Sequence, residues 1–94
     1  MESATLSKPF PLGQIMIAPK AQELLDRREI AHALRRHARG DWGEVRVQDA
    51  AANELALEEG RCVTSFYRDA ADRQFCVLTD ARHSMTLVLT YLDG

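Results

Sequence analysis

The strongest constraint on the fold lies in the last third of the chain, where three strand-like runs follow one another. These runs cover residues 62–68, 73–79 and 84–92 and are rich in β-branched and aromatic side chains, which favour strands. Two polar segments, 69–72 and 80–83, separate the runs and have the length of hairpin turns. We therefore expect a three-stranded antiparallel meander at this end of the domain.

The first two thirds of the chain have the spacing of helices. A short apolar run over 14–18 predicts a strand, and the proline that follows it suits the first turn of a helix over 19–28. Apolar residues at helical intervals predict a second helix over 29–39, either continuous with the first or separated from it by a break near Arg28. A third helix is expected over 47–59, ended by the glycine that follows it.

The length of the chain, 94 residues, allows one hydrophobic core. Its 46% hydrophobic and 28% charged residues are ordinary values for a globular protein and argue against a disordered chain. We expect a single α+β domain over 10–94, with the helices packed on one face of the sheet, after a flexible segment over 1–9. A domain of this size is marginally stable, so association with a partner or a second copy would stabilise it.

A register for the meander follows if each turn is centred on its polar residues. Val63 then lies opposite Leu78, and Leu78 lies opposite Met85. This register places Cys62 and Cys76 on opposite faces, and together with a cytosolic setting it predicts two free thiols. The face that we assign to the core, under the helices, carries Val63, Ser65, Tyr67, Cys76, Leu78, Met85, Leu87, Leu89 and Tyr91.

The other face of the predicted sheet is more apolar than a surface that meets only water. It places Phe66 directly opposite Phe75, beside Val77 and Val88, with hydroxyl side chains around them. An apolar centre with a polar rim is typical of protein interfaces, so these four residues predict a contact surface for a protein partner or a second copy. The alternative is that the N-terminal segment over 10–15 folds across this face and covers it.

Basic residues follow one side of the second predicted helix. Arg28, His32, Arg35 and Arg39 recur at intervals of four, three and four residues, and Arg36 flanks them. Such a stripe is typical of a site that contacts phosphates or an acidic protein, or else of a solvated face partly neutralised by the acidic third helix. The formal net charge of -2 at pH 7 disfavours nucleic acid as the partner.

The sequence lacks the short motifs that carry catalytic or phosphate-binding chemistry. It has no glycine-rich phosphate loop, no Cys-x-x-Cys, no His-Glu-x-x-His and no nucleophile elbow. Its two cysteines and three scattered histidines do not supply the four convergent ligands of a zinc site. We therefore expect no catalytic residue, no cofactor and no metal, and a protein that is not an enzyme.

Three further positions have structural interpretations. His37 lies on the apolar side of its helix and is expected in the core. Asp80 lies in a turn whose acid, base and hydroxyl neighbours do not converge on a substrate, so we interpret it as a turn former. Trp42 either anchors the turn between the second and third helices to the core or forms a hot spot for partner binding.

Signals for export or membrane insertion are not found in the sequence. Its start has no basic segment followed by an apolar run, and no stretch approaches the length that spans a bilayer. We expect a cytoplasmic protein without a membrane partner.

Several segments together resemble a protein family. They are Phe-Pro-Leu-Gly-Gln-Ile at 10–15, the run 37–43 that contains Gly-Asp-Trp-Gly, Ala-Asn-Glu at 52–54, and Thr-Asp at 79–80 before a threonine-rich last strand. In these features the chain is similar to small uncharacterised bacterial proteins carried on plasmids and integrative elements. The family has no established catalytic residues. Small proteins from such elements include inhibitors of restriction and of CRISPR defence, which act by covering a surface of a host complex.

Three functional hypotheses follow from these features. The first is a non-enzymatic protein-binding module from a mobile genetic element, such as an anti-CRISPR or anti-restriction inhibitor. The second is a small ribonuclease toxin, because helices followed by a meander resemble messenger-cleaving toxins, although the negative net charge disfavours it. The third is a DNA-binding regulator, whose binding would weaken steeply with salt.

Overall fold

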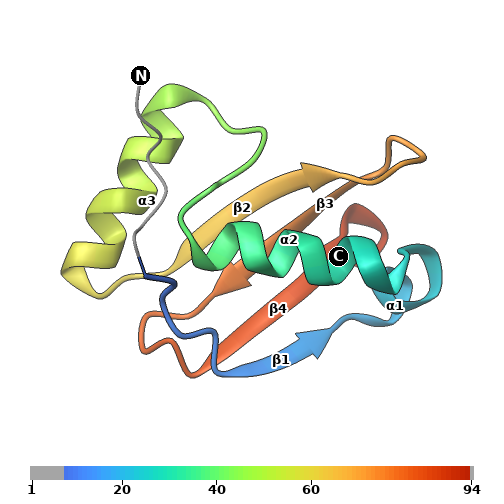
Figure 1. Cartoon of the computed structure of the whole chain (residues 1–94), viewed down its shortest axis with the longest axis horizontal. Helices are drawn as coiled ribbons and strands as arrows, with labels where there is room; N and C mark the ends of the chain where they lie inside the picture. Colours follow the sequence, from blue (N-terminus) through green and yellow to red (C-terminus); the bar gives the residue numbers. More distant parts are fainter. Residues whose placement is uncertain (1–7, 94) are drawn as a thin grey trace.

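The computed structural model describes residues 8–93, which form an α+β fold, as the sequence predicts (Figure 1). The predicted flexible segment over 1–9 lies outside these residues except for Lys8 and Pro9. In chain order the elements are β1 (Gln14–Ile17), α1 (Pro19–Leu24), α2 (Arg27–Ala38), α3 (Val47–Glu59), β2 (Val63–Arg68), β3 (Gln74–Thr79), β4 (Met85–Thr90) and a 3-10 turn (Tyr91–Asp93).

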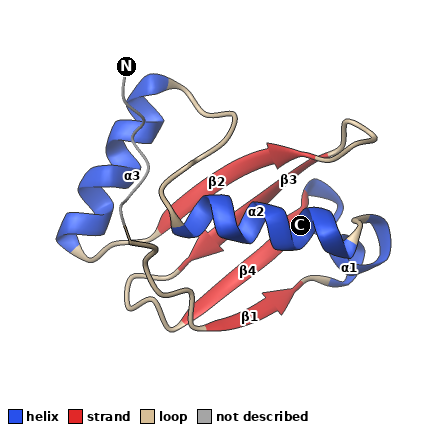
Figure 2. Ribbon diagram, in the orientation of Figure 1, coloured by secondary structure: helices blue, strands red, loops and turns tan. Residues whose placement is uncertain are grey.

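The sheet has four strands in the order β1-β4-β3-β2 (Figure 2). The antiparallel meander of β2, β3 and β4 is present, but β1 adds a fourth strand, parallel to β4, and makes the sheet mixed. The backbone N–H of Gln14 donates to Ser84 O at 2.9 Å, and that of Ala18 donates to Val88 O at 2.9 Å. The predicted sheet therefore lacked one edge strand. The pattern of apolar residues within 14–17 carries no information about a strand partner some seventy residues away.

The break between the first two helices falls at Leu25 and Asp26, slightly before the predicted position near Arg28. The Asp26 carboxylate accepts a hydrogen bond from the Arg28 N–H at 2.7 Å and so caps the first turn of α2. The third helix has its predicted bounds, and Gly60 ends it with a positive φ of 69°.

Helices α1 and α2 pack on one face of the sheet, the inner face, and α2 lies across the strands in Figure 1. Their contact is the main hydrophobic core, which closes the domain on this side. It consists of Ala21, Leu25, Ile30, Ala33, Tyr67, Phe75, Val77 and Val88.

A second apolar cluster joins α3 to the end of the sheet. It contains Phe10, Trp42, Ala56 and Val63, with Leu12, Val45, Ala50 and Leu57 packed against it. Phe10 also donates its backbone N–H to Ala38 O at 2.9 Å, so the entry segment is bound to the end of α2. The alternative in which residues 10–15 cover the other sheet face is therefore wrong.

The free edge of β2 is closed by the loop before α3 and by α3 itself. Phe66 N–H donates to Trp42 O at 3.0 Å, and Glu44 N–H donates to Phe66 O at 2.7 Å. The Asn53 amide pairs with both backbone groups of Thr64, at 3.2 and 2.8 Å. These bonds occupy the outward backbone groups of Thr64 and Phe66 and hinder the addition of another strand there.

Gly43 allows this closure because it lies directly against β2. Its φ is +75°, and a Cβ at this position would collide with the Phe66 carbonyl oxygen and the Tyr67 ring. The neighbouring Asp41 accepts a hydrogen bond from Gly43 N–H at 3.2 Å. The Gly-Asp-Trp-Gly run therefore has a structural role here.

The register of the meander differs from the predicted one. Val63 pairs with Thr79, and Leu78 pairs with Leu87. The first turn has five residues between the paired Arg68 and Gln74, one more than the sequence interpretation assumed. An extra residue in a hairpin turn reverses the faces of the following strand.

The physical cause of the longer turn is the Asp69 carboxylate. It accepts hydrogen bonds from Ala71 N–H at 3.0 Å and Arg73 N–H at 2.7 Å, and it forms an ion pair with the Arg73 side chain at 3.1 Å. Asp72 takes a left-handed φ of 66° to close the loop. The second turn is two residues longer than assumed, which keeps β4 in phase with β3.

The core prediction is therefore right for β2 and wrong for β3 and β4. Val63, Ser65 and Tyr67 are buried on the inner face, as expected. In β3 and β4 the buried residues are instead Phe75, Val77, Thr79, Thr86, Val88 and Thr90.

Over residues 8–93, none of the helices is both long enough and apolar enough to cross a membrane.

Candidate protein-contact surface

The face of the sheet opposite α1 and α2 is apolar and has no charged side chain at its centre. We call it the outer face; in Figure 1 it is turned away from the viewer, behind the strands. Phe66, Met85 and Met16 are 37%, 37% and 46% exposed, and the others are partly buried by one another. Its residues are Met16, Thr64, Phe66, Cys76, Leu78, Met85, Leu87 and Leu89.

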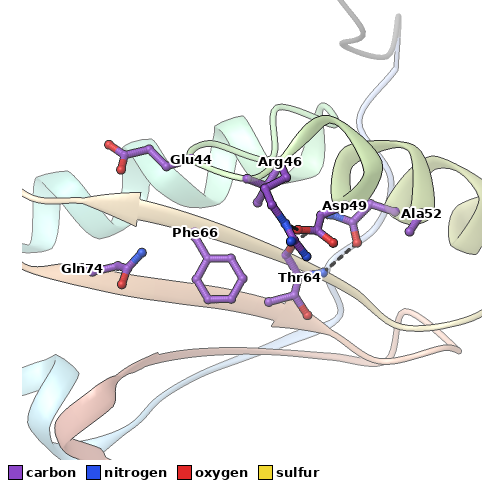
Figure 3. Close-up of a pocket in the computed structure, with 9 residues that line it drawn as sticks. Glu44, Arg46, Asp49, Ala52, Thr64, Phe66 and Gln74 are labelled. Atoms are coloured by element: carbon purple, nitrogen blue, oxygen red, sulfur yellow. Dashed lines mark hydrogen bonds and ion pairs between the residues drawn. The ribbon is translucent and has the colours of Figure 1, made fainter.

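Two hollows indent the β2 side of the outer face. The larger, of about 400 Å³, lies between β2 and the start of α3. Figure 3 shows the Phe66 ring in this hollow, with Arg46 and Asp49 on the helix side and Gln74 on the other. The smaller, of about 200 Å³, is lined by Phe66, Gln74, Phe75, Cys76, Leu89, Thr90 and Tyr91.

Phe66 and Gln74 line both hollows, so the two form one groove along the end of the sheet. Three charged residues line the larger hollow, namely Glu44, Arg46 and Asp49, and the Arg46 Nε atom lies 3.0 Å from the Asp49 Oδ2 atom at the start of α3. An apolar centre with a polar border is the arrangement that protein interfaces share.

The inner face is mixed, because it buries a row of polar side chains beside the residues of the hydrophobic core. His37 Nδ1 lies 2.6 Å from Ser65 Oγ, and His37 Nε2 lies 2.8 Å from Thr79 Oγ1. Thr79 Oγ1 lies 2.7 Å from Thr86 Oγ1, which donates to Leu12 O at 2.7 Å. All five groups form one chain of hydrogen bonds from β2 across the sheet to the entry segment.

The direction of each hydrogen bond in this series follows from the last bond, in which the Thr86 hydroxyl donates to the Leu12 carbonyl. The single hydroxyl proton of Thr86 is given to the Leu12 carbonyl, so Thr79 must donate to Thr86. Thr79 then accepts from His37 Nε2–H, and Nδ1 accepts from the Ser65 hydroxyl. The neutral imidazole satisfies every group, and a second ring proton would take from the Ser65 hydroxyl the acceptor at Nδ1.

His37 is fully buried, in agreement with the expectation that it belongs to the core. Burial, with a smaller repulsion from His83, lowers the pKa of His37 from 6.5 to about 4. The edges of two aromatic rings enclose it, with ring centroids 5.3 Å away at Phe10 and 5.8 Å away at Trp42. His37 therefore stabilises the fold as a neutral group.

Four of the predicted contact residues lie in the interior. Phe75, Val77 and Val88 are 3%, 0% and 0% exposed because the longer turn directs them under the helices. Trp42 is 3% exposed and packs in the second cluster, so it anchors the loop and offers no hot spot. Of the predicted aromatic patch, the outer face keeps only Phe66.

The basic stripe is largely present on the exposed side of α2. Arg28, Arg35 and Arg39 are exposed, and none of them forms an ion pair with an acidic side chain in the described part of the chain. Arg36 does not belong to it: its guanidinium binds Asp41 through two hydrogen bonds, at 2.8 and 3.2 Å, and lies 4.6 Å from the centre of the Tyr67 ring. This pairing lowers the pKa of Asp41 and raises that of Arg36.

The acidic residues of α3 do not neutralise the stripe. Asp49 pairs with Arg46, and Glu59 pairs with Arg61 at 2.8 Å. The three arginines of the stripe therefore remain available to an acidic partner.

Both cysteines are free, as predicted. The register from which this was predicted, with the two thiols on opposite faces of the sheet, differs from the observed one. Cys76 is partly buried in the outer face, where burial raises the pKa of its thiol, and Cys62 is exposed just before β2. Asp80 is a turn former: its carboxylate accepts from the Ser84 N–H and hydroxyl at 2.8 and 2.6 Å. Within residues 8–93, His, Cys, Asp and Glu side chains form no group of three that could hold a metal ion.

Comparison with protein-family models, curated proteins and solved structures gives no match to this chain. The resemblance to proteins of mobile genetic elements therefore stays a prediction.

Sequence reasoning missed six residues of the outer face, namely Met16, Cys76, Leu78, Met85, Leu87 and Leu89. A usable signal was the Asp-x-x-Asp-Arg run at 69–73, in which an aspartate can bind backbone N–H groups two and four residues later and so lengthen the turn. The parallel pairing that brings Met16 to this face has no comparable local signal.

Proposed function

We propose that this protein is a non-enzymatic protein-binding module whose outer face is the contact surface. The observation that carries this proposal is the outer face itself: leucine, methionine and phenylalanine side chains face outward on the side of the sheet opposite α1 and α2. A continuous apolar face of this kind on a small domain is characteristic of interaction sites.

The geometry of the groove supports this function. Phe66 lies at the junction of the two hollows, so an apolar side chain of a partner can be inserted on either side of the ring. Buried aromatic anchors surrounded by weaker contacts supply most of the binding free energy in protein interfaces. The Arg46–Asp49 pair and Gln74 provide hydrogen-bonding groups at the rim.

The arginine stripe of α2 supplies a second surface of different chemistry. Arg28, Arg35 and Arg39 are exposed and unpaired with acids among the described residues, and they lie on the side of the molecule opposite the outer face. An acidic protein surface is the complement of this stripe.

The test is retention of a protein on a column of the tagged chain. Leu87→Asp places a charge in the outer face without disturbing the core, and we expect it to abolish retention. Val47→Asp is the matched control, since Val47 is 86% exposed on α3, and it should retain the partner. Retention that is equal for both variants contradicts the outer face as the contact surface.

The same column separates the remaining hypotheses. Retention of a restriction or CRISPR complex is the result that a defence inhibitor gives. Release by Arg35→Glu with Arg39→Glu, but not by Leu87→Asp, identifies the stripe as the contact. Duplex DNA bound at low salt and released by moderate salt favours the DNA-binding alternative, and growth arrest on expression favours the ribonuclease alternative.

A further inference from the structure

We infer that the outer face binds a second copy of this chain, so that two sheets stack face to face about a two-fold axis. The inference rests on the proposed role of the outer face as a contact surface and names its occupant. It follows from the charge, the shape and the area of that face.

The charge of the outer face suits self-association. Its eight residues include no charged side chain, so two copies stack without like-charge repulsion. Charges occur at the border of this face and are paired or hydrogen-bonded within the chain: Arg68 with Glu44, Arg46 with Asp49 beside the larger hollow, and Asp80 with Ser84. Because the outer face is not basic, it does not select an acidic partner.

The shape of the outer face is self-complementary. Met85 protrudes at the start of β4, and the hollow of about 200 Å³ lies at the other end of the same strand, beside Leu89 and Tyr91. A two-fold axis in the interface, perpendicular to the strands, places the Met85 of each copy over the hollow of the other. Methionine is the side chain that best adapts to such a cavity, and the paired contact is that of an isologous dimer.

The area of the outer face agrees with the core of a dimer interface. Four strands spaced by about 4.8 Å, over about five residues of about 3.3 Å each, cover about 300 Å². A stable interface buries about 800 Å² on each partner, with an apolar core and a polar rim. The exposed Tyr91, which lines the smaller hollow, extends the contact beyond the sheet.

The resulting dimer has two sheets inside and the helices outside. Sheets that stack in this way lie about 10 Å apart with nearly aligned strands. The arginine stripes of both copies then face solvent on opposite sides and stay open to other partners.

The measurement is the molar mass by light scattering and sedimentation over a range of concentrations. We expect a mass that approaches twice 10.6 kDa as the concentration rises. Leu87→Asp should raise the dissociation constant by about thirtyfold or more, as for a residue at an interface hot spot. Val47→Asp should leave it unchanged, and a wild-type chain that is monomeric at every concentration overturns the inference.

Cysteine alkylation locates the interface independently. Cys76 lies in the outer face and Cys62 is exposed away from its centre, so the two thiols are reporter and internal control in one chain. Alkylation of Cys76 should slow with rising protein concentration, whereas alkylation of Cys62 should not. A dimer in which the Cys76 rate is independent of concentration overturns this interface.

The competing dimer would pair the two β1 edges. The amides of Ile15 and Ile17 point away from β4, since Gln14 and Ala18 make the ladder bonds, and no strand within residues 8–93 pairs with this edge. Ile15→Pro removes one outward N–H and keeps the ladder intact. A dimer that Ile15→Pro dissociates and Leu87→Asp does not would overturn stacking through the outer face.

Failure of this inference differs from failure of the proposed function. A monomeric wild-type chain whose partner is lost in Leu87→Asp overturns the dimer and leaves the protein-binding function in place. A dimer that Leu87→Asp dissociates, with capture of another protein unchanged, supports the dimer and overturns the outer face as the site for that other protein.

Discussion

The two faces of the same sheet differ in their polar content: the inner face buries hydroxyl side chains beside valine and aromatic residues, and the outer face is apolar at its centre. Ser65, Thr79, Thr86 and Thr90 lie on the face under the helices, and leucine and methionine side chains lie on the face toward solvent. The comparison shows that burial in this protein is decided by hydrogen bonding as much as by hydrophobicity. A polar group is stable inside when each of its donors and acceptors has a partner.

The inner face meets this condition through an unbroken chain of hydrogen bonds. The chain joins His37 to hydroxyls of all three meander strands and ends at the Leu12 carbonyl. It gives the inner face a single arrangement, because each bond has only one possible direction. The apolar side chains at the centre of the outer face need no hydrogen-bond partners, and we propose that this face serves as a contact surface.

The largest expected difference between the faces is the cost of a charge. Val77→Asp, on the inner face, buries an unpaired carboxylate and should cost more than about 4 kcal/mol of the free energy of unfolding, a large part of what a small domain has. Leu78→Asp, one residue later on the outer face, should cost about 1 kcal/mol or less in dilute, monomeric protein. Urea denaturation followed by circular dichroism measures both.

Alanine variants extend this comparison if Val77→Asp does not fold. Val77→Ala should lose clearly more stability than Leu78→Ala, because only the first leaves a cavity in a closed core. Equal losses at the two positions would mean that the outer face is covered within the monomer.

The next effect is the dependence of stability on pH. The folded pKa of His37 is about 4, below the ordinary 6.5 of the unfolded chain, so between these values the unfolded state binds a proton that the folded state excludes. Stability is therefore complete above pH 6.5 and falls as the pH falls, by up to about 3 kcal/mol near pH 4.

Measurements between pH 6.5 and 4.5 isolate this effect. The aspartates whose pKa values are lowered, such as Asp41 and Asp69, lose their contribution at lower pH, below the ordinary 3.8. A free energy of unfolding that stays constant over this range would contradict a neutral, buried His37.

The smallest effect concerns a single hydroxyl. Thr79→Val keeps the shape of the side chain and removes the acceptor of His37 Nε2–H, which should cost about 1–3 kcal/mol. Cys76→Ser, on the outer face of the same strand, should change the stability of the monomer by about 0.5 kcal/mol or less. Thermal denaturation of both variants at pH 7 makes the comparison, and a Thr79→Val protein as stable as Cys76→Ser would show that the hydrogen-bond chain is unimportant.

Local signals predicted the elements well and their pairing poorly. The bounds of α3 and its glycine end follow from residues within the helix, and the strands of the meander follow from their own composition. The faces of β3 and β4 depend on the length of one turn, which Asp69 sets by its hydrogen bonds. Because both faces of these strands are apolar enough to be buried, alternation alone did not reveal the error.

The candidate site was predicted in kind but only partly in its residues. An apolar outer surface and a basic stripe were expected, and Phe66, Arg28, Arg35 and Arg39 are exposed as those predictions require. Phe75, Val77 and Val88 lie on the inner face instead, because the observed register differs from the predicted one. Arg36 left the stripe because Asp41, five residues later, is within reach of its guanidinium.

The sequence by itself determined the α+β class, the order of the elements and the presence of a surplus apolar surface, because composition and periodicity act within a few residues. Only the tertiary structure decided which residues form that surface, that β1 joins the sheet in parallel, and that a neutral histidine is buried among hydroxyls. These features depend on contacts between residues far apart in the chain, and their free energy appears only when the distant partners have met.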